Sequence, residues 1–210
     1  VQIELIYHAI KSSQFEAASE IVVNDGRQLV SQGYMELLGL IEQIETDDLT
    51  SSVVIRMAQL QGDILALLGR LNEAETVLND TLERAQSTAG ELVQAEILSS
   101  LADVSRKQGN SELSLNRHKA ALKHYISLGN ARWAARTYNN IGYLLRRKNE
   151  RNKALEAYGE VEAILESSDD DELIYSQITL ARSLIELGEV DRAREHAMAS
   201  HERTSALGDG

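Results

Sequence analysis

Hydrophobic residues recur at helical spacing in segments separated by short polar turns. No linker long enough to divide the chain is visible, because 46–50 and 167–171 have only the length of turns between helices. The pattern predicts an all-α fold of about eleven helices, at about 2–11, 14–30, 34–44, 50–68, 71–87, 91–108, 111–128, 131–148, 151–166, 172–187 and 190–206.

One eight-residue pattern returns along most of the chain. It occupies 62–69, 102–109, 142–149 and 181–188, so that its last residue advances by 40, 40 and then 39 positions. A fixed period of this size is typical of a stacked array, in which no single unit can bury its apolar face alone. Arrays of this kind usually bind other molecules and rarely catalyse reactions.

Each unit carries small residues where two antiparallel helices would touch. A small residue lies midway along one helix, a turn residue follows seven positions later, and another small residue opens the next helix. Gly or Asn at the turn tolerates the left-handed backbone that ends a helix. Asn72, Asn152 and Asp191 recur at the start of the second helices, where we expect them to act as N-caps. The sets are Gly62, Gly69 and Ala74; Ala102, Gly109 and Ser114; Gly142, Asn149 and Ala154; and Ala181, Gly188 and Ala193.

The segment Tyr138–Leu145, followed by Ala154–Tyr158, resembles the tetratricopeptide repeat (TPR), a helix-turn-helix unit. The ordinary repeat is shorter and closes with a proline, whereas this chain has no proline and matches a variety with longer helices. The resemblance covers residues 50 to 210. It implies a right-handed superhelical solenoid of antiparallel hairpins with a concave inner face, and repeats at about 50–88, 91–128, 131–166 and 172–206.

The first 45 residues fit the period less well. Tyr7–Ala18 indicates one hairpin turn and Leu29–Leu38 an extra helix. This segment resembles the start of the helical-repeat region in STAND-class signal-transduction ATPases, including transcription activators of the maltose-regulator type. We therefore expect an atypical N-terminal part at 1–45 and a TPR-like part at 46–210 that form a single continuous array.

Two features predict that the array is part of a longer protein. Val1 is not an initiator methionine, and Leu207-Gly208-Asp209 repeats Leu128-Gly129-Asn130 after 79 residues. We expect at least one more hairpin after Gly210 and other domains before Val1.

Composition changes this picture little. Hydrophobic residues make up 43% of the chain and aromatic residues 4%, enough aliphatic side chains for a continuous core. Cysteine is absent, which removes disulfides and thiolate metal sites, and no apolar run approaches the ~20 residues of a membrane span. Without a recognisable signal peptide, the expected location is the cytoplasm.

Charge is unevenly distributed along the chain. The formal net charge of −12 argues against nonspecific binding to nucleic acid or to anionic membranes. From Arg117 to Lys153, however, ten Lys or Arg face one acid, Glu150, which gives +9 here and −21 elsewhere. Cations at a helix end complement the helix dipole, which explains part of this basic segment. The alternative is a site for an acidic partner.

The first helix of each hairpin lines the inner face of TPR arrays, so the resemblance places a candidate binding groove there. An Arg-Asn-Tyr cluster in the third hairpin can hydrogen-bond an extended peptide and pair with its carboxylates. Helical spacing selects Arg56, Gln59 and Asp63; Glu96, Ser99, Asp103 and Arg106; Arg136, Asn139, Asn140, Tyr143 and Arg146; and Tyr175, Ile178 and Arg182.

Other interpretations of these residues remain open. The same side chains can form a solvated polar face with internal ion pairs, such as Asp103 with Arg106 or with Arg136. A partner can also bind the convex side, around Lys119 and Lys123. Trp133, the only tryptophan, is expected to pack between repeats or to contact a ligand near the basic segment.

Catalytic and cofactor motifs are not found in the sequence. There is no Gly-rich phosphate loop, and no two histidines have the three- or four-residue spacing of metal ligands on one helix. The acidic run at 169–172 lacks the spaced oxygens and glycine of a calcium loop. We therefore expect no enzyme activity, cofactor or metal, and a protein or peptide partner, or a small-molecule effector. The array is either the sensor or arm of a larger signal-transduction or transcription-regulatory ATPase, or a general scaffold.

Overall fold

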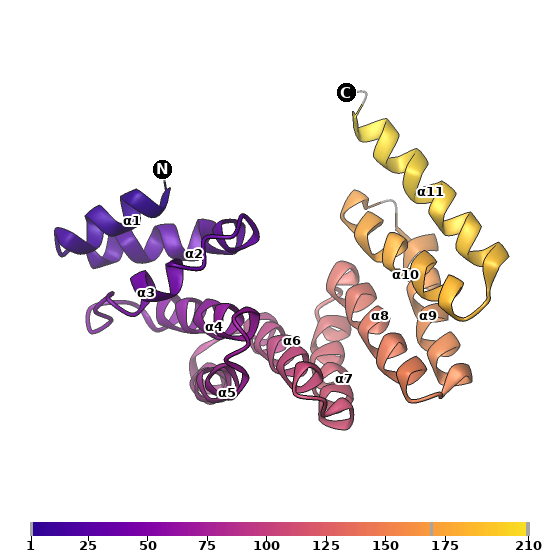
Figure 1. Ribbon diagram of the computed structural model, residues 1–210, viewed down its shortest axis with the longest axis horizontal. Coiled ribbons are helices and arrows are strands. Elements are labelled where there is room, and N and C mark those ends of the chain that lie inside the picture. The colour runs from indigo at the N-terminus through magenta and orange to yellow at the C-terminus, as the bar shows by residue number, and fades with distance from the viewer. Residues whose placement is uncertain (1, 169, 209–210) are drawn as a thin grey trace. The chain divides into compact units, whose positions relative to one another are not determined.

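The computed structural model describes residues 2–168 and 170–208. Within these ranges all regular secondary structure is helical, as the hydrophobic pattern predicts (Figure 1). The helices are α1 (Gln2–Lys11), α2 (Phe15–Ser31), α3 (Leu37–Ile41), α4 (Ser51–Leu67), α5 (Leu71–Thr88), α6 (Glu91–Lys107), α7 (Ser111–Ser127), α8 (Ala131–Arg147), α9 (Arg151–Glu166), the 3-10 helix η1 (Asp171–Leu173), α10 (Ile174–Glu186) and α11 (Val190–Gly208).

The chain divides into two compact units, Val1–Ser114 (unit 1) and Leu115–Gly210 (unit 2), and α7 spans the boundary. The expected boundary between an atypical part and a TPR-like part at residue 45 stays a prediction. The acidic run at 169–172 and the recurrence at 207–209 include Asp169 and Asp209, which lie outside the described residues.

Unit 1 contains two hairpins, α1–α2 and α4–α5, followed by α6 (Figure 1). Its buried core includes Ile6, Val22, Leu37, Ile64 and Leu78, all with exposed fractions of 0%. The helix expected at 34–44 is shorter, because α3 covers only Leu37–Ile41. Gly33 adopts a φ of 96°, which helices do not contain, and Leu37, Leu38, Ile41 and Ile44 are buried along a path that is only partly helical.

Unit 2 contains the hairpins α8–α9 and α10–α11 and most of α7. Its largest fully buried side chains include Tyr125, Leu144, Tyr158 and Leu180. The expected helix at 172–187 begins instead with the 3-10 turn η1 and continues as α10, and Leu173 of this turn is fully buried.

Every hairpin turn contains one residue in the left-handed backbone region. The turn residues are Ser13, Gly69, Gly109, Asn149 and Gly188, with φ angles of 55°, 77°, 83°, 60° and 78°. The last four are the turn residues that the period predicts, and Ser13 extends the same register to the first hairpin. Left-handed backbone terminates the preceding helix and lets the chain reverse.

The prediction that Asn72 and Asn152 act as N-caps is wrong. The N-cap residues of α5 and α9 are Arg70 and Glu150, and neither caps its helix with its side chain. Asn72 therefore lies inside the first turn of α5, where its carbonyl accepts a hydrogen bond from Thr76 Oγ1 at 3.0 Å. Asparagine caps form instead at the starts of α7 and α8, where Oδ1 of Asn110 accepts from the Leu113 backbone N–H and Oδ1 of Asn130 from the Trp133 backbone N–H, each at 3.2 Å.

Small residues allow the two helices of a hairpin to touch. A Cβ at Gly142 would lie 2.7 Å from Cζ and 2.8 Å from Cδ1 of Tyr158. At Gly62, a Cβ would lie 2.7 Å from Cδ2 of Leu78. These distances are shorter than van der Waals contact, so each glycine is needed where the first helix meets the second. Gly129, by contrast, has nothing within 4 Å of a Cβ, but its φ is 63°.

We predict that Gly142→Leu destabilises the protein much more than Gly129→Leu. The first substitution forces the Tyr158 ring out of a packed hairpin and should cost about 3 kcal/mol or more. The second adds only backbone strain, about 1–2 kcal/mol. Thermal and urea unfolding of both variants measures the difference. Equal losses would show that the two helices are not held together at residue 142.

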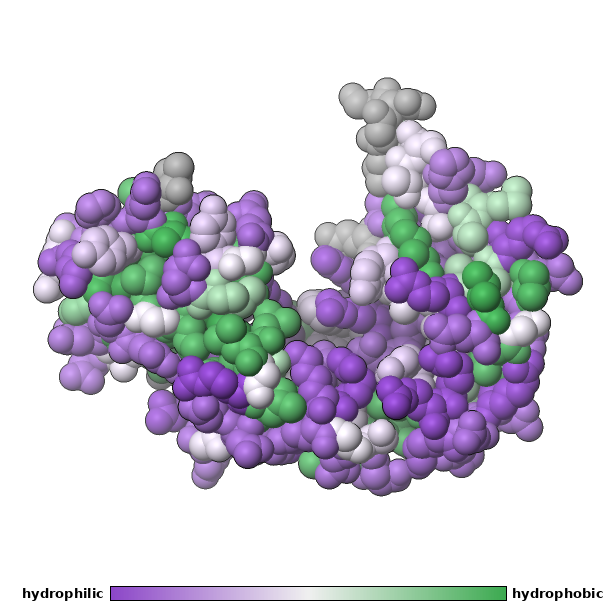
Figure 2. All heavy atoms as spheres, in the orientation of Figure 1, coloured by the Kyte–Doolittle hydropathy of each residue, from purple (hydrophilic) through white to green (hydrophobic). Residues whose placement is uncertain are grey.

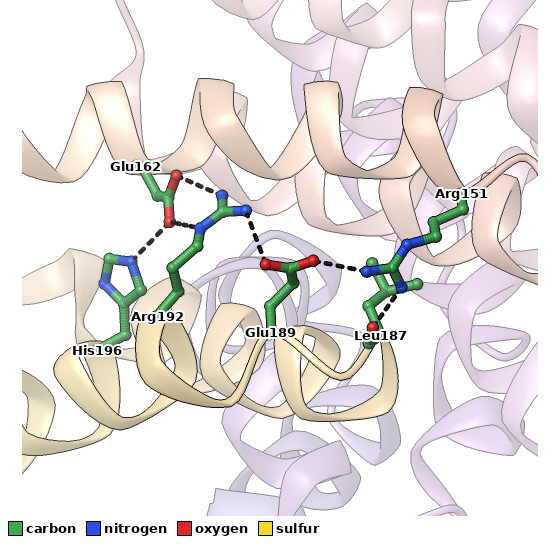
Figure 3. Close-up of polar contacts among 6 residues, drawn as sticks. All are labelled: Arg151, Glu162, Leu187, Glu189, Arg192 and His196. Atoms are coloured by element: carbon green, nitrogen blue, oxygen red, sulfur yellow. Dashed lines mark hydrogen bonds and ion pairs between the residues drawn. The ribbon is translucent and has the colours of Figure 1, made fainter.

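A polar network ties α9 to the next hairpin in unit 2 (Figure 3). Glu162 accepts hydrogen bonds from Arg192 Nε at 3.1 Å and Nη2 at 2.7 Å, and its Oε1 lies 3.0 Å from His196 Nε2. Arg151 donates to Glu189 Oε1 at 2.6 Å and to the Leu187 carbonyl. Partial burial opposes ionisation of Glu162, but the hydrogen bonds from Arg192 and His196 outweigh it and lower the pKa of this carboxyl.

Candidate functional site

The predicted groove residues lie on the first helices of the hairpins, and each unit presents its own face. We call the polar side chains of α4 and α6 the unit 1 face: Arg56, Asp63, Glu96, Ser99, Asp103 and Arg106. The unit 2 face consists of side chains on α8 and α10: Arg136, Asn140, Tyr143, Arg147, Tyr175 and Arg182. All of these side chains are exposed or half-buried.

Two predicted residues are not accessible, and their assignment to the groove is wrong. Gln59 and Asn139 each have an exposed fraction of 3%. Asn139 on α8 donates from Nδ2 to the Ser176 carbonyl of α10 at 3.0 Å. The next hairpin therefore covers this position, and the amide holds two first helices together.

Arg146 is also less available than expected for a surface cation. Its side chain is 24% exposed and forms an ion pair with Glu186 of α10. Its guanidinium also lies over the Tyr143 ring, with Cζ 5.4 Å from the ring centroid. Reversing this charge would disturb the contact between α8 and α10 as well as any ligand.

The unit 1 face is acidic and partly neutralises itself. Arg27 Nη2 of α2 lies 3.4 Å from Glu96 Oε2, and Arg106 Nη2 lies 3.5 Å from Asp103 Oδ1. The second pair is one of the internal ion pairs expected from the sequence. Asp63 lies beside these groups, and burial raises the pKa of its carboxyl. A hydrogen bond with Ser100 and the charge of Arg27 lower this pKa, but they do not outweigh burial and the nearby acids.

We predict that Asp63→Asn stabilises the protein at neutral pH. Because the folded-state pKa of Asp63 is raised, the folded chain holds a proton that the unfolded chain releases above pH ~3.9, so stability falls as pH rises past that value. The neutral amide removes this loss and keeps an oxygen for Ser100. Unfolding free energies of both proteins between pH 7 and pH 3 test this: the advantage should be present at pH 7 and disappear near pH 3. A variant less stable than the parent at pH 7 would show that ionised Asp63 stabilises the fold.

The unit 2 face is built around a stacked arginine. The Cζ of Arg136 lies 5.0 Å from the ring centroid of Trp133 and 6.0 Å from that of Tyr175. Trp133 stacks in turn on the buried Tyr125, with centroids 5.8 Å apart and an interplanar angle of 15°. A guanidinium held over aromatic rings can still bind a carboxylate with its N–H edge. Both roles expected of Trp133, packing and proximity to a ligand face, are compatible with this geometry.

A second arginine on the same face was not selected from the sequence. Arg147 donates from Nη1 to the Tyr143 hydroxyl at 3.1 Å, and its Cζ lies 5.9 Å from the Tyr143 ring centroid. Arg147 lies in the last turn of α8, where a cation complements the helix dipole, and this explains its presence equally well. Arg147 lies eleven residues after Arg136, a spacing that places both on one side of α8. This spacing could have identified Arg147 from the sequence.

Large apolar side chains are also exposed on the last hairpin. Tyr175, Ile178 and Ile185 of α10 have exposed fractions of 66%, 43% and 60%. Figure 2 shows hydrophobic atoms among hydrophilic ones in the region of α10 and α11. Tyr175 therefore adds apolar area to the unit 2 face beside its cations.

In residues 2–168 and 170–208, no group of three or more His, Asp or Glu side chains is arranged to hold a metal ion. Every helix within those ranges is too short or too polar to cross a membrane.

Comparison with a protein-family model adds independent information. The family described as tetratricopeptide repeat matches residues 93–167, which run from α6 to the end of α9. None of the curated protein sequences is a significant match to this chain.

Several solved structures share the fold at low sequence identity. BtubC (BKLC) from P. vanneervenii superposes with a TM-score of 0.67 at 17% identity, over 99% of this chain and 91% of that one. A putative kinesin light chain from Podosopora anserina with nearly identical TPR-like repeats gives 0.63 at 14%, over 100% and 95%. A Rap protein complexed with Competence and Sporulation Factor gives 0.62 at 13%, over 95% and 65%. The chain therefore has the fold of a TPR-like helical array.

Proposed function

We propose that this chain is a non-catalytic protein-binding array, and that the unit 2 face binds an acidic, extended segment of a partner. The observation that carries this proposal is Arg136, whose guanidinium carbon lies 5.0 Å from the Trp133 ring centroid and 6.0 Å from that of Tyr175. An arginine that is already ordered loses little conformational entropy when it binds, and its planar edge fits a carboxylate with two hydrogen bonds.

The surrounding charges support an acidic partner. The unit 2 face carries Arg136, Arg147 and Arg182, and none of its six residues is acidic. The segment from Arg117 to Lys153, which includes α8, has a net charge of +9 in a chain of −12. Opposite charges on the partner speed association and select it over neutral segments. Tyr143 and Tyr175 supply aromatic area for apolar side chains of the same segment.

The fold supports binding to another protein. TPR-like arrays bury their hydrophobic residues between neighbouring helices and leave the faces of the first helices available to partners. One protein with a similar fold, the Rap protein, has been crystallised with Competence and Sporulation Factor. At 13% identity this likeness supports a binding role in general and leaves the partner to be identified by experiment.

The sequence supports a finer form of the proposal. Tyr7–Ala18 and Leu29–Leu38 resemble the start of the helical-repeat region of STAND-class ATPases, so the array would be the sensor or arm of a signal-transduction or transcription-regulatory protein. It would pass the binding of a protein or small-molecule effector to a switch domain. The second candidate is a general adaptor, which the TPR-like fold supports equally. Sequencing the full-length gene distinguishes them through the presence or absence of a nucleotide-binding domain.

Selection from a displayed library of random peptides tests the binding proposal. The protein should enrich peptides rich in Asp and Glu that also carry apolar residues, and their affinity should fall as salt rises. Arg136→Glu and Arg147→Glu should each lower the affinity about tenfold or more, because each breaks charge-assisted hydrogen bonds. Helicity should not change, because both side chains are exposed.

Arg84→Glu is the matched control, since Arg84 is an exposed arginine on α5, a second helix, and belongs to neither face. It should bind the selected peptides like the parent. Enrichment of basic or neutral peptides would contradict the proposal. Equal binding by Arg136→Glu and the parent would also contradict it. The alternative site would then be the surface around Lys119 and Lys123.

A further inference from the structure

A cavity lies between α1 and α3 in unit 1. The two helices contact each other, and both contact α2, so the cavity belongs to one compact unit (Figure 1). Its volume is about 420 Å³, which is within the range of sites that hold small molecules. Side chains of α1 line one side of it, and residues of α3 and of its two flanks line the other.

The walls of the cavity are largely hydrocarbon. Ile3 of α1 and Leu40 of α3 are half-buried, and Tyr7 adds an aromatic ring that is 46% exposed. Gly39 also lines the cavity, and a Cβ placed there would meet nothing within 4 Å outside the backbone of its own helix. The cavity therefore keeps open space where a larger residue on α3 would project.

The polar groups at the cavity are mainly hydrogen-bond acceptors. Glu4 and Glu36 are exposed, and neither forms an ion pair or a side-chain hydrogen bond with another described residue. Gln43 donates from Nε2 to the Gly39 carbonyl at 2.6 Å, which uses its amino group and leaves its amide oxygen to accept. The chemistry of this lining suits a ligand that donates hydrogen bonds.

Positive charge does not neutralise the two carboxylates. No described residue that lines the cavity is a Lys or Arg. The Nζ atom of Lys11 lies 5.4 Å from the Tyr7 ring centroid, but Lys11 does not line the cavity and forms no ion pair with Glu4 or Glu36.

The surrounding unit strengthens the negative potential. Unit 1 has seven Lys or Arg and eighteen Asp or Glu, a net charge of −11, whereas unit 2 has fourteen and fifteen, a net charge of −1. The segment 36–48, which includes α3, contains five acids and no Lys or Arg. A field of one sign raises the local concentration of ions of the opposite sign, so it favours a cationic ligand.

We propose that this cavity binds a small organic amine in its protonated form. The ammonium group pairs with Glu4 and Glu36, and the hydrocarbon body of the amine lies against Ile3 and Leu40, in the space beside Gly39. An ion pair at an exposed carboxylate contributes little by itself, so binding needs the apolar contact as well. This site lies in unit 1 and does not depend on the binding of an acidic segment at the unit 2 face.

Other classes of ligand fit the cavity less well. An inorganic cation gains nothing from the apolar walls, and an organic acid is repelled by both carboxylates. A neutral apolar compound fills the space but leaves the charges of Glu4 and Glu36 unused. An amine with a hydrocarbon body uses both features of the lining.

Titration of the whole chain with 2-phenylethylamine at pH 7, followed through the amide NMR signals of Gly39 and Leu40, tests the proposal. Alkylamines stay protonated at this pH. Both signals should shift, with a dissociation constant of about 1 mM for a ligand of this size. The neutral analogue 2-phenylethanol and ammonium chloride each supply only one of the two features, so each should bind about tenfold more weakly or less.

Two variants test the lining. Gly39→Leu should abolish binding, because the leucine side chain has room to fill the cavity, and the fold should be kept, because leucine favours a helix more than glycine does. Its control is Gly159→Leu, at a glycine of α9 that likewise has open space around a Cβ. Glu4→Gln/Glu36→Gln should lower the affinity about tenfold, since each exposed ion pair contributes about threefold.

The control for this charge removal is Glu42→Gln/Glu45→Gln, which removes two exposed acids of the same segment that do not line the cavity. Both control variants should bind the amine nearly as the parent does. Circular dichroism and thermal melting show whether each variant is folded.

Four results would overturn the proposal. The first is that neither signal shifts at about 10 mM amine, ten times the expected constant. The second is equal binding of 2-phenylethanol, which would show a cavity without selectivity for cations. The third is parent-like affinity of folded Gly39→Leu or of folded Glu4→Gln/Glu36→Gln. The fourth is tighter binding by a short lysine-containing peptide than by the free amine, which would assign the cavity to a basic residue of a protein partner.

Discussion

Close contact between the two helices of a hairpin is the constraint on which the other features depend. Gly142 admits the Tyr158 ring and Gly62 admits the Leu78 side chain at distances that no larger residue allows. With the helices this close, a hairpin is too thin to enclose a core of its own. It must cover its sides with neighbouring hairpins, and this requirement produces the junctions and the exposed first-helix faces.

Most of the fold could be predicted from the sequence because its signals are local. Gly69, Gly109, Asn149 and Gly188 end helices through their own backbone conformation, and their spacing sets the period. The helices between them follow from apolar spacing within each segment. The ends of α3 could not be predicted in this way, because its length depends on how Leu37, Leu38 and Ile41 pack against other helices of unit 1. The N-caps failed because a shift of one or two residues at a helix start changes which side chain can reach the free N–H groups.

The candidate site was less predictable, because accessibility depends on the next hairpin. Helical spacing correctly put Arg136 and Tyr175 on exposed faces, and it also selected Gln59 and Asn139, which are buried. Asn139 is covered by α10, whose contact is made 37 residues further along the chain. The stacking of Arg136 on both Trp133 and Tyr175 likewise depends on how α10 lies beside α8. A period predicts which residues are equivalent, but it does not predict which residues touch.

The position of the single tryptophan gives unit 2 a spectroscopic label of its own. Trp133 lies in α8, stacked on Tyr125 and beside Arg136, and unit 1 contains no tryptophan. Its emission therefore reports the surroundings of α7 and α8 alone, whereas the far-ultraviolet circular dichroism signal reports the helices of both units. If the two signals change at different denaturant concentrations, the units unfold separately. If they coincide, the array unfolds as one cooperative body.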